Sequence, residues 1–98
     1  MQITYNKEAG KLTVAPEGRL DTVTAPEFEK TLGDLVSGVS DLILDMTKIT
    51  YVSSAGLRVI LKIQKAMSNQ GEMKLIGVNE TVMEVFEITG FANILRIE

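Results

Sequence analysis

The chain has 98 residues, 45% of them hydrophobic and 23% charged, which predicts one compact soluble domain spanning residues 1–98. It contains no cysteine and no histidine, which excludes disulfides and removes the usual general base and the commonest metal ligand, so we expect no metal and no cofactor. The net charge of −3 gives nucleic acid no general electrostatic reason to bind, and no apolar run approaches the ~20 residues that a membrane-spanning helix needs.

The first twenty residues predict two strands. Ile3 and Tyr5 alternate with polar residues, as do Leu12 and Val14, and this period is typical of half-buried strands. The segment KEAGK between them is typical of a hairpin turn. The chain opens without the features of a signal peptide, so we expect a cytoplasmic protein.

A loop, a helix and an interior strand are expected next. The segment GRLDTVTAPEF leads into the helix through a loop that carries Asp21, and Thr24 with Glu27 has the spacing of a capping box. The run Leu42–Leu44 indicates a buried strand, with Asp45 at its carboxyl end in a position that suits either a function or a turn. We expect a loop over residues 46–52.

The longest predicted helix runs from Ala55 to about Gln70. Apart from one narrow polar stripe, the positions of this helix are mostly apolar, which predicts that it is largely buried. The stripe consists of Arg58, Lys62, Lys65 and Asn69. Its basic residues could face an acidic partner, although a solvated helix face is the simpler interpretation for Lys65.

The last third of the chain predicts a strand, a third helix and a short final element. MKLIGV has the character of a strand, and Asn79 caps a helix whose outer face is acidic and most simply solvated. The segment ILRI suits either an edge strand or a short helix. Strands and helices therefore alternate after the hairpin, which argues for an α/β layered domain with a mixed sheet.

Two neighbouring hydroxyls, Ser53 and Ser54, stand where the longest helix begins. One of them could simply be the N-cap, which stabilises a helix by about 1 kcal/mol. A catalytic serine needs a base, and without histidine only scattered carboxylates and lysines are available. A third interpretation is phosphorylation, because the free amides and the dipole at a helix start tolerate negative charge. The two serines therefore fit a modification site that controls binding better than a catalytic nucleophile.

Three segments in this order resemble the STAS domain of free-standing bacterial anti-sigma factor antagonists. They are GRLDTVTAPEF, LILDMTKITYVSSAGLRVI and MKLIGVNETVMEVFEITGF, which together cover most of the chain. The resemblance implies a small mixed sheet of four to five strands, with about four helices packed mainly on one face.

The resemblance also implies a phosphorylation site. The acceptor of the family lies two residues before the glycine of the helix start, which corresponds to Ser54 with Gly56. Ser53 stands where many antagonists have aspartate, so Ser53 is the alternative acceptor. Asp21 matches a loop acid beside the acceptor, although an ordinary turn aspartate fits the same position. The implied partner-binding surface comprises Asp21, Ser53, Ser54, Gly56, Arg58 and Lys62.

The function implied by the resemblance is a non-enzymatic switch. The unphosphorylated protein would bind an anti-sigma factor that is also a serine kinase, and phosphorylation would release it and so control the sigma factor. The kinase would supply ATP and magnesium, and a phosphoserine phosphatase would reset the switch. The alternative is a STAS module that senses a small ligand or scaffolds a signalling complex, and a small hydrolase using Ser54 is a remote third possibility.

Overall fold

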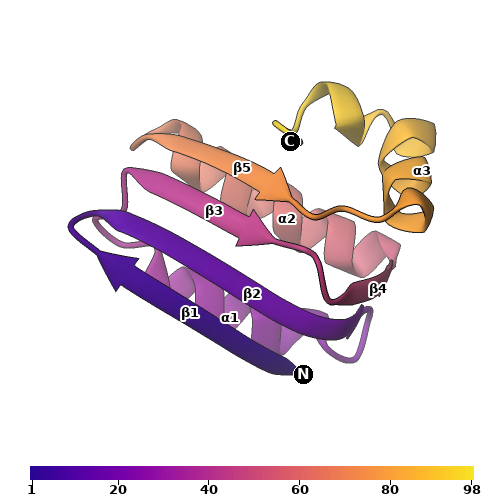
Figure 1. Cartoon of the computed structure of the whole chain (residues 1–98), viewed down its shortest axis with the longest axis horizontal. Coiled ribbons are helices and arrows are strands. Elements are labelled where there is room, and N and C mark those ends of the chain that lie inside the picture. Colours follow the sequence, from indigo (N-terminus) through magenta and orange to yellow (C-terminus); the bar gives the residue numbers. More distant parts are fainter.

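The chain folds into one five-stranded sheet with helices against it (Figure 1). The computed structural model describes residues 1–98. In chain order the elements are β1 (Gln2–Glu8), β2 (Lys11–Leu20), α1 (Ala25–Leu35), β3 (Asp41–Asp45), β4 (Ile49–Val52), α2 (Ser54–Ser68), β5 (Glu72–Ile76), α3 (Glu80–Thr89) and the 3₁₀ turn η1 (Phe91–Asn93). The predicted α/β fold with a mixed sheet is confirmed.

β2 is the strand that organises the sheet. It pairs antiparallel with β1, parallel with β3 along its first residues, and parallel with β4 along its last three. β5 lies parallel to β3 on the far side. The β1–β2 hairpin closes through Ala9 and Gly10, whose φ angles of 47° and 83° are those of the turn that best fits the twist of paired strands.

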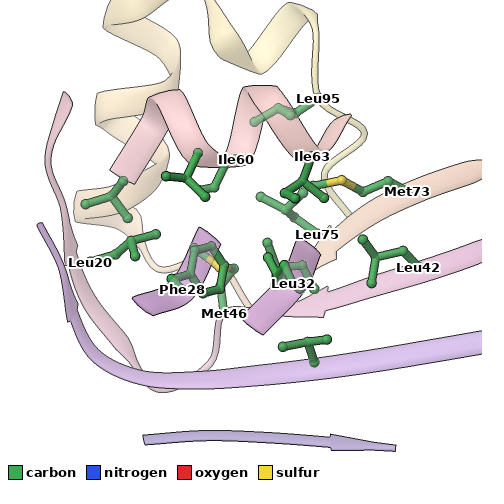
Figure 2. Close-up of a cluster of buried hydrophobic side chains, with 14 of the residues drawn as sticks. Leu20, Phe28, Leu32, Leu42, Met46, Ile60, Ile63, Met73, Leu75 and Leu95 are labelled. Atoms are coloured by element: carbon green, nitrogen blue, oxygen red, sulfur yellow. The ribbon is translucent and has the colours of Figure 1, made fainter. Parts of the chain in front are cut away.

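The helices α1 and α2 cover one face of the sheet and lie behind it in Figure 1, while α3 lies at the end of the sheet beside β4. Alternate residues of the strands point towards the helices, as the buried positions Leu12 and Val14 of β2 show. Figure 2 shows side chains from the sheet, from both covering helices and from the C-terminal segment gathered into one cluster. The C-terminal segment belongs to this cluster through Leu95, which is buried.

Two expectations about the elements need correction. The loop expected over residues 46–52 contains β4, whose two end residues are buried and whose two middle residues are exposed. The register shifts between the pairs Gly18–Ile49 and Arg19–Tyr51, which leaves Thr50 as an extra residue in β4. The burial of β4 therefore does not follow period two, and the pattern was missed. There are three α-helices and one 3₁₀ turn rather than about four helices. In the ILRI segment, Ile97 makes a single parallel bridge to Leu75.

Candidate functional site at the start of α2

Strand pairing brings the two segments singled out in the sequence side by side. Leu20 at the end of β2 is opposite Val52 at the end of β4, and the backbone N–H of Ser53 donates to the carbonyl of Leu20 across 2.9 Å. The chain leaves β2 into the loop that begins at Asp21 and leaves β4 directly into α2. The predicted loop acid and the two serines therefore lie at one end of the sheet.

Gly56 lets the first turn of α2 approach the end of β2. A Cβ atom on this residue would lie 2.7 Å from the carbonyl oxygen of Leu20 and 2.8 Å from its Cγ, closer than real Cβ contacts allow. Gly56 is buried. Gly56 was predicted to be part of the partner-binding surface. Because it is buried, its role is to let α2 pack closely on β2, and the exposed atoms at this place belong to its neighbours.

The two serines have different surroundings. Ser53 is half-buried and is the N-cap of α2, with its hydroxyl oxygen accepting from the Gly56 N–H at 3.4 Å, a long distance for such a bond. Ser54 is the first residue of α2, is exposed, and its hydroxyl makes no hydrogen bond to another residue of the chain. The structural interpretation of a serine N-cap thus accounts for Ser53 and leaves the Ser54 hydroxyl free.

Asp21 shapes the loop between β2 and α1. Its Oδ1 accepts from the N–H groups of Val23 and Thr24 at 3.0 and 3.2 Å. The pKa of Asp21 is lowered from its ordinary value of 3.8, mainly by the Thr24 N–H. Desolvation is the second-largest effect and raises the pKa, while the Val23 N–H, the Thr24 hydroxyl and Arg19 each lower it further. The loop therefore carries a lasting negative charge next to the start of α2.

The predicted capping box at Thr24 is wrong. The Thr24 hydroxyl donates to the carbonyl of Arg19 at 2.7 Å and accepts from the Asp21 N–H at 2.9 Å, so it closes the loop and makes no cap bond to α1. Glu27 contacts the N-terminal amino group at 3.2 Å. The sequence spacing was right for a box, but the Asp21 turn competes successfully for the threonine hydroxyl.

Arg19 and Tyr51 are surface residues that the sequence reasoning missed. They are opposite each other in the β2–β4 pairing, and the Arg19 guanidinium carbon lies 4.4 Å from the centre of the Tyr51 ring. Arg19 Nε is also 3.5 Å from Asp21 Oδ2. The only signal for this pair is the register of β4, so the pair could not be found once β4 was assigned to a loop.

The basic stripe of α2 is exposed as predicted, but its members differ. Lys62 is held by Glu29 of α1, with 2.8 Å between Nζ and Oε2. Arg58 and Lys65 form no ion pair within the chain. Of the three cations, Lys62 already serves to join α1 to α2, so Arg58 is the unpaired cation nearer to Ser54.

A shallow groove of about 300 Å³ lies between the Asp21 loop, α1 and the first turns of α2. Its walls combine small apolar residues with one acidic and one basic side chain. The lining residues are Thr22, Ala25, Pro26, Glu29, Ala55, Arg58 and Val59. Val23, on the same loop, is 86% exposed, which is unusual for a large apolar side chain and suits contact with another molecule.

Asp45 forms a turn after β3. Its Oδ1 accepts from the Thr47 N–H at 3.0 Å, as expected for a turn-forming aspartate, which was one of the two interpretations of this residue. No group of three or more His, Cys, Asp or Glu residues is placed to hold a metal ion. None of the helices combines the length and the apolar character needed to cross a membrane.

The STAS domain family model matches residues 2–98. This chain belongs to the STAS domain family. It is 36% identical to BtrV of Bordetella bronchiseptica, described as a candidate anti-sigma factor antagonist, over 99% of this chain and 85% of that protein. A candidate anti-sigma factor antagonist from Thermotoga maritima has a closely similar structure, with a TM-score of 0.89 and 26% identity over 97% of this chain and 84% of that one.

The anti-sigma factor antagonist SpoIIAA shares the fold at lower identity. Its unphosphorylated form has a TM-score of 0.75 at 14% identity, over 99% of this chain and 87% of that one. The phosphorylated form of SpoIIAA, a Bacillus cell fate determinant, has a TM-score of 0.74 at 14% identity, over 99% of this chain and 91% of that one. The resemblance inferred from the sequence segments is confirmed, and these relatives are regulatory proteins.

Proposed function

We propose that this STAS domain binds an anti-sigma factor with serine kinase activity while Ser54 is bare, and releases it when Ser54 is phosphorylated. The observation that carries the proposal is the exposed, unbonded Ser54 hydroxyl beside the Asp21 loop. The names of the relatives support an anti-sigma factor as the partner. SpoIIAA, a protein of the same fold, has been solved in both phosphorylation states, which supports a modification-controlled antagonist.

Magnitudes support a switch on binding over a switch on folding. A phosphate adds about −1.5 to −2 charges, while a charge at a helix start changes stability by only about 0.3 to 1 kcal/mol. An unpaired charge buried in an interface costs about 2 to 5 kcal/mol, and each 1.4 kcal/mol is about a tenfold change in affinity. Phosphorylation at this exposed position therefore leaves the domain folded and weakens docking strongly.

Ser54 is a better acceptor than Ser53 in this proposal. A kinase must reach the hydroxyl oxygen, and Ser54 is exposed while Ser53 is half-buried. The Ser53 oxygen also has a local task as the N-cap of α2. A phosphoserine phosphatase would return the protein to its binding state, and the proposed partners place the switch in the cytoplasm.

The proposal is tested by recovering the partner with the unmodified chain and titrating it against variants. We expect Ser54→Ala to bind like the parent and Ser54→Asp to bind at least about 30-fold more weakly. Ser37→Asp is the matched control, because Ser37 is exposed beyond the far end of α1. Equal affinity of Ser54→Asp and the parent would refute the switch. A partner that is no anti-sigma factor would instead favour a scaffolding STAS module.

The modification itself is tested with the same partner. Incubation with the purified partner, ATP and magnesium should add one phosphate, which mass spectrometry of proteolytic fragments assigns to Ser54. Ser53→Ala should still be phosphorylated, and Ser54→Ala should not. Transfer to Ser53 in the parent chain would replace Ser54 by Ser53 as the acceptor.

A further inference from the structure

Arg58 is an exposed cation without a partner, one turn from Ser54. None of the seven ion pairs of the chain includes it. The carboxylate that lines the same groove, that of Glu29, is already held by Lys62 at 2.8 Å. The Arg58 guanidinium is therefore free to bind an anion that appears beside it.

Helix geometry directs Arg58 towards Ser54. Residues four apart lie on the same face of a helix, and a helical side chain leans towards the N-terminus, over the preceding turn. Arg58 is four residues after Ser54 in α2, so helix geometry puts the two side chains on the same face, with Arg58 able to reach back towards Ser54. The corresponding residue four after Ser53 is Leu57, which is buried. Only a phosphate on Ser54 has a cation in this position.

We infer that Arg58 binds the phosphate carried by Ser54 in the modified chain, an inference that rests on the proposed phosphorylation. A guanidinium can donate two parallel N–H bonds to phosphate oxygens, and a negative group N-terminal to a positive one is the favourable order on a helix. The contact draws the guanidinium away from the groove that it lines with Ala25 and Val59. Phosphorylation then changes the docking surface twice, because it adds a negative charge and also engages the free cation.

The other charged groups around this site are already engaged with one another. Asp21 lies on the neighbouring loop and is 3.5 Å from Arg19 Nε, and Glu29 on α1 pairs with Lys62. The acidic residues repel a phosphate and raise its second pKa, whereas Arg58 lowers it. These opposing effects make the ionisation of the phosphate a direct measure of its contact with Arg58.

The test uses full-length protein in which phosphoserine is inserted at position 54 during translation. Phosphorus NMR follows the second ionisation of the phosphate, which has a pKa of about 6 when unperturbed. We expect Arg58→Gln to raise this pKa by roughly 0.3 units or more. Lys65→Gln is the matched control, because it removes the same charge from an exposed residue nearly two turns further along α2, and it should leave the pKa unchanged.

A second readout identifies the contact directly. The Arg58 Nε–H signal in nitrogen-resolved NMR should move with the same midpoint as the phosphate signal, and it should stay still when position 54 is serine. An unchanged phosphate pKa in Arg58→Gln, or an equal rise in Lys65→Gln, would overturn the inference. Because the phosphate is inserted without a kinase, that failure would leave the proposed function standing. Conversely, a partner insensitive to phosphoserine 54 would refute the proposed function alone.

Discussion

The starts of α2 and α3 have the same construction and different charge. Each helix follows a short polar N-cap, Ser53 for α2 and Asn79 for α3, whose side chain accepts from the N–H three residues on. The next residue is Glu80 in α3, whereas α2 begins with Ser54 and has no acidic residue in its first turn. α3 thus carries a permanent negative charge where α2 carries a hydroxyl. The corresponding position of α2 is therefore neutral, as the proposed phosphorylation of Ser54 requires.

The caps also differ in quality. Asn79 accepts from the Val82 N–H at 2.8 Å and donates its amide to the carbonyl of Ile49 at 2.9 Å, so it joins α3 to β4. The Ser53 cap is a single long bond of 3.4 Å. The start of α2 depends instead on close packing at Gly56 against Leu20. We therefore expect the start of α3 to be destabilised most by loss of its cap side chain, and the start of α2 by an added methyl group at Gly56.

The largest effect is expected from Gly56→Ala. The added methyl group overlaps the carbonyl of Leu20, and overpacking of this kind costs about 1 to 3 kcal/mol, more than the helix propensity that alanine adds. Urea denaturation with an unchanged m-value measures the loss. Gly33→Ala on α1 is the control, because nothing lies within 4 Å of its added Cβ and it should gain up to about 1 kcal/mol. Equal stability of Gly56→Ala and the parent would show that α2 can shift freely.

The caps should give the next largest effect. Asn79→Ala removes both side-chain hydrogen bonds of the residue and should cost about 1 to 2 kcal/mol. Ser53→Ala removes one long bond and should cost about 0.5 kcal/mol. Both losses are read from the same urea titration, with Ser37→Ala as the reference for an exposed serine outside any helix. A greater loss in Ser53→Ala than in Asn79→Ala would reverse the ranking of the caps.

Adding a negative charge at the start of α2, or removing one from the start of α3, should change the stability less than the substitutions above and in opposite directions. Ser54→Asp gives α2 the charge that α3 already has and should stabilise the domain by about 0.3 to 1 kcal/mol at low salt, less whatever repulsion Asp21 adds. Glu80→Gln should destabilise it by a similar amount. Thermal unfolding at low and high salt separates these charge effects, which salt screens, from packing effects. Destabilisation by Ser54→Asp at low salt would show that this helix start does not tolerate an anion.

The features predicted correctly from the sequence are those decided locally. Alternating apolar residues identified β1 and β2 as strands, although Tyr5 of β1 is exposed rather than half-buried. Asn79 was recognised as the cap of α3. The position of Ser54 at the start of α2 followed from the change to a helical period. These patterns depend on neighbours a few residues apart, so one sequence is enough to find them.

The features that were missed depend on contacts between distant segments. β4 has four residues, and its burial follows from its irregular pairing with the end of β2, in which Thr50 has no partner. The Arg19–Tyr51 contact and the Lys62–Glu29 pair join residues far apart in sequence. The hydroxyl of Thr24 had two possible partners, and only the shape of the Asp21 loop decides between them. The spacing of residues in the sequence does not determine the strand pairing, the long-range side-chain contacts or the partner of the Thr24 hydroxyl.

The smallest effect is expected from Asp21, through the pH dependence of stability. This aspartate lies on the loop at the same end of the sheet as the start of α2, and its carboxylate accepts hydrogen bonds from that loop. Its pKa is lowered in the folded chain, chiefly by the Thr24 N–H, so its contribution to stability is present above its ordinary pKa of 3.8 and is lost as pH falls through the lower folded value. Asp21→Asn keeps an oxygen for the turn but cannot ionise. The stability difference between the parent and Asp21→Asn should therefore be constant near pH 7 and shrink below about pH 4 in urea titrations. Asp34→Asn on α1 is the control, and the same pH dependence in both variants would show that Asp21 is not specially stabilised.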